Sequence, residues 1–163
     1  MSTDNVDEVR QRIIHLAREI EEMSQQRMSS EDYFVQFLQR VVGAVGGRAG
    51  AVWVQNGSHQ IQLLADHRLE STGFHDNPDA LRCNSRLLQE VMQNGQACTH
   101  SPDDGDVELP TDDLIILGAL QRQQECVGVV EIFQRKDTPA QARTGFLQFV
   151  EQMCGHACRH LER

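Results

Sequence analysis

The sequence lacks long apolar runs, an excess of positive charge and paired spacing among its cysteines. No apolar run in its 163 residues is longer than eight positions, so no segment is long enough to cross a bilayer as a helix. A net charge of −9 argues against nucleic acid or anionic membranes as partners, because both require basic patches. Five cysteines, an odd number, are typical of free thiols in a reducing compartment. These absences predict a cytoplasmic protein without membrane insertion.

Familiar catalytic motifs are also missing. The chain has no Gly-x-Ser-x-Gly, no phosphate-binding loop and no His-Glu-x-x-His, and its seven histidines fall mostly on predicted loops or polar helix faces. The N-terminus has no signal-peptide apolar core. We therefore expect a non-enzymatic domain, long enough to bury a core without disulfides or a structural metal.

Two apolar runs form the centre of the predicted fold. Leu114–Leu120 and Cys126–Phe133 are strand length and rich in β-branched residues, and the polar segment 121–125 joins them. They predict an antiparallel hairpin at the centre of a sheet that is covered on both faces. Glu131 breaks the pattern, since it shares a face with apolar neighbours such as Val129. A lone carboxylate there needs a partner or a route to water.

The remaining pattern predicts an α+β fold, in which helices flank a five- or six-stranded antiparallel sheet. A box that begins at Ser29 is expected to cap the second helix, and Asn84 or Ser85 the third. The acidic stretch 101–113 is expected to be a mobile loop or a lid. The expected helices are 4–27, 29–45, 85–93 and 138–161, the expected strands are 49–55, 60–65, 97–100 and the central pair, and 66–80 is expected to be a loop.

The first predicted helix carries a heptad stripe. Its apolar residues follow a 3-4-3-4-3 spacing, which is typical of the seam of a coiled coil or helix bundle. The same stripe is equally compatible with packing on its own domain. The sequence thus divides into an N-terminal dimerisation or signalling helix, 1–28, and a domain, 29–163. The stripe consists of Val6, Val9, Ile13, Leu16, Ile20 and Met23.

Three segments resemble a GAF domain. They are RAGAVWVQNGSHQIQLLA for a first hairpin, SRLLQEVMQNGQACTHSP for a helix that runs into a short strand, and ECVGVVEIFQRKDTPAQARTGFLQFVEQMCGHACRHLE for the last strand and helix. The resemblance, which spans about 29–162, implies a GAF/PAS-like sheet with the first and last helices on one face and a ligand pocket on the other. The Asn-Lys…Phe…Asp-Glu pattern of the cyclic-nucleotide type is missing. Bilin-binding relatives carry Cys-His where this chain has Cys83-Asn84, so neither ligand is expected.

The expected pocket lies on the sheet face that carries Trp53 and Glu131. Trp53 would offer a stacking surface, Glu131 or His100 a polar anchor, and Phe74 and His75 part of the rim. The competing interpretation places Trp53 in the core and pairs Glu131 with an arginine.

The cysteines allow two further hypotheses. Cys154 and Cys158 fall on the apolar stripe of the last helix and His156 and His160 on its polar side, so the pairs diverge and no metal site is expected. Cys83 and Cys98 are the better candidates for a thiol-based redox sensor or a methionine-sulfoxide-reductase-like enzyme.

The resemblance implies a sensory or regulatory domain that binds a small molecule or partner and signals through dimeric terminal helices. No cofactor is identified, and a homodimer is expected. The end of the chain inside a helical pattern suggests a piece of a longer signalling protein. The main alternative is a ligand-free module for dimerisation or protein interaction.

Overall fold

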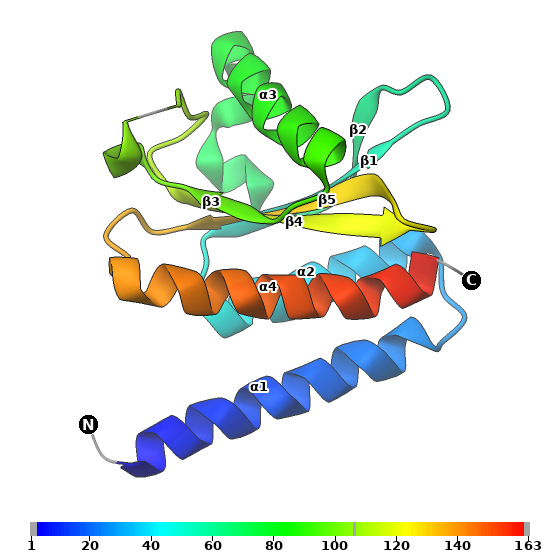
Figure 1. Ribbon diagram of the computed structural model, residues 1–163, viewed down its shortest axis with the longest axis vertical. Coiled ribbons are helices and arrows are strands. Elements are labelled where there is room, and N and C mark those ends of the chain that lie inside the picture. The colour runs from blue at the N-terminus through cyan, green and yellow to red at the C-terminus, as the bar shows by residue number, and fades with distance from the viewer. Residues whose placement is uncertain (1–2, 106, 162–163) are drawn as a thin grey trace.

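A computed structural model describes residues 3–105 and 107–161 as helices packed on both faces of one antiparallel sheet, which confirms the α+β prediction (Figure 1). None of the described helices has the length and apolar character needed to cross a membrane. The helices are α1 (Thr3–Ser24), α2 (Ser30–Val45), α3 (Pro78–Asn94) and α4 (Ala140–Leu161), with short 3-10 turns η1 (Leu69–Thr72), η2 (Phe74–Asp76) and η3 (Pro102–Asp104). The strands are β1 (Ala49–Gln55), β2 (Ile61–His67), β3 (Cys98–His100), β4 (Leu114–Arg122) and β5 (Glu125–Gln134).

The strand order is β2-β1-β5-β4-β3, so β5 is the central strand and the predicted central hairpin is confirmed. Its connection is shorter than predicted. Arg122 and Glu125 still pair, and only Gln123 and Gln124 form the turn, at φ values of 53° and 71°. Two consecutive residues with positive φ match the twist of a hairpin even without glycine. The predicted five-residue linker is therefore wrong.

The helices divide between the two faces. Helices α2 and α4 lie against one face, α3 covers the other, and α1 packs outside α2 and α4 as a further layer (Figure 1). The first and last helices thus share one side of the sheet, as predicted. Ser29 caps α2 as expected, since its hydroxyl accepts a hydrogen bond from the amide N–H of Asp32 at 3.1 Å.

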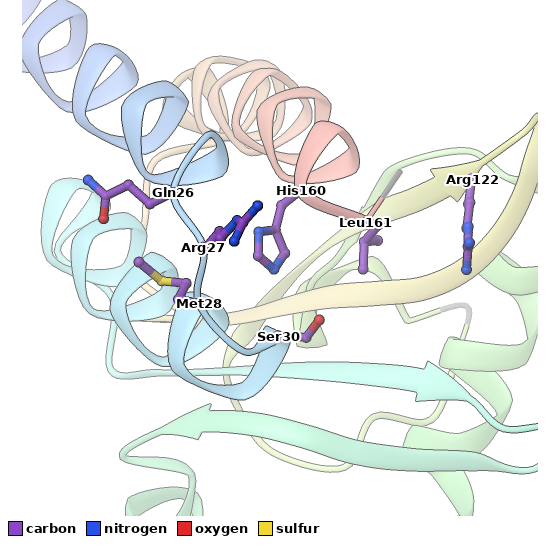
Figure 2. A pocket seen from close by; sticks show the side chains of 7 residues that line it. All are labelled: Gln26, Arg27, Met28, Ser30, Arg122, His160 and Leu161. Atoms are coloured by element: carbon purple, nitrogen blue, oxygen red, sulfur yellow. The ribbon is translucent and has the colours of Figure 1, made fainter. Parts of the chain in front are cut away.

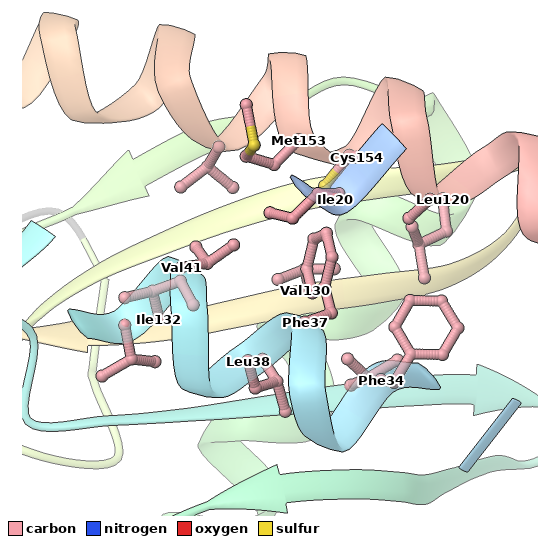
Figure 3. Packing of buried hydrophobic residues seen from close by; sticks show 14 of the residues in the cluster. Ile20, Phe34, Phe37, Leu38, Val41, Leu120, Val130, Ile132, Met153 and Cys154 are labelled. Atoms are coloured by element: carbon pink, nitrogen blue, oxygen red, sulfur yellow. The ribbon is translucent and has the colours of Figure 1, made fainter. Parts of the chain in front are cut away.

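The face of the sheet covered by α2 and α4, which we call the helical side, holds a large apolar core. We call this core the lower cluster (Figure 3). Ile20 of α1, Phe37 of α2, Met153 of α4 and Val130 of β5 are all fully buried in it. Burying one apolar face of each helix in a shared core is the main source of stability for such a layer. Its buried members are Ile20, Met23, Tyr33, Phe34, Phe37, Leu38, Val41, Val42, Val45, Val52, Ala65, Ile116, Leu120, Val130, Ile132, Phe149, Val150, Met153, Cys154 and Ala157.

The heptad stripe of α1 contributes to this core within the chain. Ile20 and Met23 are buried there, and Ile13 and Leu16 pack against its edge. The side chains of Val6 and Val9 lie outside the described residues. A dimer through the stripe, and a division of the chain at residue 28, stay predictions.

Helix α3 begins seven residues earlier than predicted. Asn77 caps it by accepting hydrogen bonds from the amide N–H groups of Asp79 and Ala80, and Pro78 occupies the first turn. The prediction of a cap at Asn84 or Ser85 is wrong, because Asn-Pro already supplies a strong start signal at 77–78. Asn84 is instead buried within the helix and faces the sheet.

Helix α4 buries more than its apolar stripe. Cys154 is in the core as expected, but His160 is only 9% exposed, and its ring stacks on that of Tyr33 with centroids 4.1 Å apart. The expectation of surface histidines is therefore wrong for His160. Because α4 has the sheet on one side and α1 and α2 on others, residues away from its stripe are also covered.

Candidate functional site

A buried carboxyl group lies at the centre of the sheet. Glu131 of β5 is fully buried, and its Oε1 accepts hydrogen bonds from Nε1 of Trp53 at 2.8 Å and from Nδ2 of Asn84 at 3.1 Å. Trp53 stands on the neighbouring strand β1 and Asn84 on the covering helix α3. We call these three residues the polar triad. Trp53 and Glu131 lie on one face of the sheet, as the sequence predicted. The alternative prediction, an arginine partner for Glu131, is wrong.

Two oxygens of the polar triad have no hydrogen-bond partner. They are Oε2 of Glu131 and Oδ1 of Asn84, and both are buried. Burial, which penalises the charged form, raises the pKa of Glu131 to about 7, although the bonds from Asn84 and Trp53 act in the opposite direction. A buried polar atom without a partner costs free energy, so these two oxygens make the polar triad the candidate site.

Apolar side chains surround the polar triad in a second core, the upper cluster. Phe74 of η2 is 2% exposed, and its ring lies 5.7 Å from that of Phe133 on β5. Phe74 thus belongs to the packed interior of this face and not to a rim, and the side chain of His75 lies outside the described residues. The buried members are Ala49, Ala51, Leu69, Phe74, Ala80, Leu87, Leu88, Val91, Ile115, Leu117, Val129 and Phe133.

His100 lies on the edge strand β3, away from the polar triad in the sheet order. It lines a hollow of about 250 Å³ together with Ser101, Asp104 and other residues of the acidic loop. Its Nε2 is 3.6 Å from Sγ of Cys98. The structure therefore unites Trp53 and Glu131 but assigns His100 to a separate surface hollow.

The acidic loop is tied to the frame near both ends. Asp113 is buried, and both of its carboxylate oxygens accept hydrogen bonds from Arg48 at 2.7 and 2.9 Å. Asp104 forms an ion pair with Arg143 of α4 at 3.2 Å and accepts a hydrogen bond from the amide of Ser101. These contacts use acids of the loop for attachment to neighbouring elements.

The two candidate redox cysteines lie on different elements. Cys83 is buried on α3, Cys98 is half-buried on β3, and both are free thiols. Burial, with a further contribution from Glu90, raises the pKa of Cys98 to about 11, the opposite of what a reactive thiol requires. Among the residues that the structure describes, no group of three or more His, Cys, Asp or Glu side chains could hold a metal ion.

Two larger hollows lie on the helical side. One, of about 850 Å³, opens where α1 turns into α2 beside the end of α4, and Arg27, Arg122 and His160 line it (Figure 2). The other, of about 460 Å³, is an apolar groove between α1, α2 and α4 that includes Ile13 and Phe146.

Sequence reasoning missed Asn84 as a site residue. A helix taken to begin at Ser85 leaves Asn84 at its cap. The Asn77-Pro78 start would have placed Asn84 one helical turn before the apolar pair Leu87 and Leu88, on the buried side.

Comparison with known proteins connects this architecture to solved structures. No family model matches the chain, and no curated protein matches it. The GAF domain of nlh2 from A. aeolicus in an inactive state superposes with a TM-score of 0.71 at 12% identity, over 94% of this chain and 98% of that one. The GAF domain of a putative sensor histidine kinase from Pseudomonas syringae pv. tomato gives 0.70 at 14% identity, over 99% and 92%.

A third similar structure is an enzyme. It is free methionine-R-sulfoxide reductase from Neisseria meningitidis in complex with its substrate, with a TM-score of 0.67 at 9% identity over 92% of this chain and 88% of that one. Similarity at these identities concerns the fold, which can carry different functions. The layered helices, the β2-β1-β5-β4-β3 sheet and these superpositions together show that the chain has the GAF-domain fold.

Proposed function

We propose that this chain is a sensory or regulatory GAF domain that binds a small molecule beside the polar triad and signals through α1 and α4 of a homodimer. It has no catalytic activity of its own in this proposal. The observation that carries the proposal is the fully buried Glu131, whose Oε2 lacks a partner within an otherwise apolar face. Such a group is characteristic of binding sites, where a ligand completes the hydrogen bonding.

The chemistry of the polar triad limits the ligand. Oε2 of Glu131 and Oδ1 of Asn84 are both acceptors, so a ligand that presents N–H or O–H donors would satisfy them. The half-buried indole of Trp53 adds a flat surface for an apolar or aromatic part of the same molecule. Similar folds occur in a sensor histidine kinase and a methyl-accepting chemotaxis protein, which supports a sensory use.

Strand β5 connects this site to the core that the terminal helices share, because its residues belong to both clusters. Glu131 points to the upper cluster, while its neighbours Val130 and Ile132 point to the lower cluster with α2 and α4. Successive residues of a strand face opposite sides of the sheet, so a shift of β5 at Glu131 moves contacts on the helical side. A ligand that displaces β5 would thus shift the contacts of α4 and, through α4, those of α1.

Strand β4 makes the connection to α4 close. A Cβ atom on Gly118 would lie 2.6 Å from Sγ of Cys154 and 3.0 Å from Cγ1 of Val150. The absence of a side chain at Gly118 therefore lets α4 pack near the backbone of the sheet. Tight packing of this kind transmits small displacements instead of absorbing them.

Native mass spectrometry of protein purified without denaturation tests ligand binding. An additional non-covalent mass that is present in wild type and in Glu125→Gln but reduced in Glu131→Gln would support a ligand at the polar triad. Glu125 is a matched control, because it is an exposed carboxylate on the same strand. Equal retention by both variants would place the ligand elsewhere.

A ligand-free interaction module is the second candidate function. It is favoured by the close apolar packing around the polar triad, where side chains such as Leu87 and Phe133 are buried. This alternative predicts a bare dimer in the same spectrum and no response of Trp53 fluorescence to any small molecule tested. A ligand-dependent change in Trp53 emission would reject it.

The homodimer has a test of its own at the apolar groove beside α1. Gly145 lines this groove on α4, is exposed and has open space around its Cα. If a second copy packs here, Gly145→Glu should convert dimer to monomer in analytical ultracentrifugation. Gly155→Glu, on the same helix and also with open space, is the control that should remain dimeric. A wild-type monomer at high concentration would contradict this part of the proposal.

A further inference from the structure

The polar triad contains an incomplete pair of hydrogen bonds. Nδ2 of Asn84 donates to Oε1 of Glu131 at 3.1 Å, while the second oxygen of each group, Oε2 and Oδ1, is buried without a partner. Both of these remaining atoms are acceptors when the carboxyl group is ionised, so neither can satisfy the other.

We propose that Glu131 and Asn84 form a proton-binding site, in which a neutral carboxylic acid donates its Oε2–H to Oδ1 of Asn84. The proton comes from solvent and the carboxylate becomes a carboxylic acid. The amide then donates to the acid through Nδ2 and accepts from it through Oδ1. The ligand class at this site is thus a single proton, and the domain senses pH.

The hydrogen-bond inventory supports the neutral form. In the proposed pair one added proton would give partners to both buried acceptors, whereas the ionised form leaves both without a donor and buries a full negative charge. Trp53 is compatible with either form, because its Nε1 donates to Oε1 and not to the oxygen that carries the proton.

No cation compensates the charge among the residues that the structure describes around Glu131. Among the described residues, the side chains that act on its pKa are those of Asn84 and Trp53, which are both uncharged. On β4 and β5 and in η2 its neighbours in the upper cluster are apolar. The charged residues of the covering helix α3 are all exposed on its outer side: Asp79, Arg82, Arg86 and Glu90.

The protonation state of Glu131 would change at pH values near neutrality. Burial raises the pKa of Glu131 to about 7, so a modest change of pH around neutrality changes the fraction of neutral acid. This proton site does not require the small-molecule ligand proposed above. Deprotonation would instead be one route by which the same face changes its contacts with α3.

Trp53 reports directly on the site, since it is the only tryptophan in the chain and its indole N–H bonds to Glu131. We expect Trp53 emission of the ligand-free wild type to change with a one-proton transition centred near pH 7. Glu131→Gln should lose this transition, because glutamine imitates the neutral acid by donating to Oδ1 of Asn84. Glu125→Gln retains all seven histidines and Glu131, and should titrate like wild type.

A transition that persists in Glu131→Gln would assign it to another titratable group and overturn the proposal. A constant Trp53 emission from pH 5 to 9 would overturn it as well.

Infrared difference spectroscopy on the wild type needs no variant. A carboxylic-acid carbonyl band should be present at pH 6, where ordinary carboxyl groups are ionised, and should disappear with the same midpoint as the fluorescence. Absence of the band at pH 6 would show that Glu131 is ionised and contradict the proposal.

The proton and a donor ligand would use the same two oxygens, but the two tests have separate readouts. A bare mass spectrum together with a pH transition would support proton sensing without a small molecule, and a bound mass without a transition would do the reverse.

Discussion

The two faces of the sheet differ in what they bury. The lower cluster joins three helices to the sheet through apolar side chains such as Phe37 and Val130. The upper cluster has a single covering helix, α3, and encloses a carboxyl group, an amide and an indole N–H. The first is built for stability, whereas the second accepts a cost in stability to keep Glu131 out of water. This difference is the basis of our proposal that the upper face is the site of regulation.

The largest expected loss of stability comes from the lower cluster. Phe37 of α2 is fully buried in this cluster. Phe37→Ala should lower the free energy of unfolding by about 3–5 kcal/mol, from lost transfer energy and the cavity left behind. Chemical denaturation at fixed pH measures this. A loss comparable to that of an exposed substitution, such as Val35→Ala, would contradict the role of the lower cluster.

On the upper face, Glu131 should make the wild-type protein less stable at high pH. The folded protein keeps the proton of Glu131 up to its pKa of about 7, whereas the unfolded chain releases it near the ordinary value of 4.5. Stability therefore falls as pH rises between these values and is level above them. Glu131→Gln should remove this decline and gain on the order of 3 kcal/mol at pH 9.

Denaturation of both proteins at pH 5 and pH 9 measures the effect of Glu131→Gln. Equal pH dependence in wild type and variant would show that Glu131 is not the group responsible.

A side chain added at Gly118, where β4 lies close to α4, should destabilise the protein. Gly118→Ala places a methyl group against Cys154 and should destabilise by about 1–3 kcal/mol, as overpacking does. Cys154→Ala in the same chain should recover part of this loss. Gly155→Ala, at an exposed position of α4 with open space for a methyl group, is the control, and it should be neutral or slightly stabilising. Thermal unfolding compares the four proteins, and no recovery in the double variant would contradict this contact.

Removal of a helix cap on each face should have a smaller effect on stability and allows the two faces to be compared. Ser29→Ala removes the cap of α2 on the lower side, and Asn77→Ala removes the cap of α3 on the upper side. Each should cost about 1 kcal/mol. We expect hydrogen exchange to increase mainly in α3 for Asn77→Ala, because α3 covers the sheet alone. If α3 exchanged equally fast in the Ser29→Ala and Asn77→Ala variants, the Asn77 cap would not be what holds α3.

Much of the fold follows from local patterns in the sequence. The two central apolar runs, the two strands of the first hairpin and the second helix all lie close to their predicted bounds. The tight turn at Gln123-Gln124 was not predictable in this way, because neither residue is typical of positive φ. The three-layer burial of α4 also exceeds any local signal, since it depends on α1 packing over it.

The candidate site was half predictable. Trp53 and Glu131 lie on neighbouring strands with matching alternation, which periodicity reveals. Asn84 joins them from α3, and its position depends on how the helix crosses the sheet. A buried asparagine in a helix is indistinguishable from a surface one until the helix start is known.

Hydrogen exchange of α1 and α4 in wild type and Glu131→Gln tests the central claim most directly, namely that the state of Glu131 reaches the terminal helices through β5. After correction for intrinsic rates, we predict that both helices exchange faster in wild type than in Glu131→Gln at pH 8.5, and equally at pH 5.5. Identical exchange of α1 and α4 in the two proteins at both pH values would contradict the account.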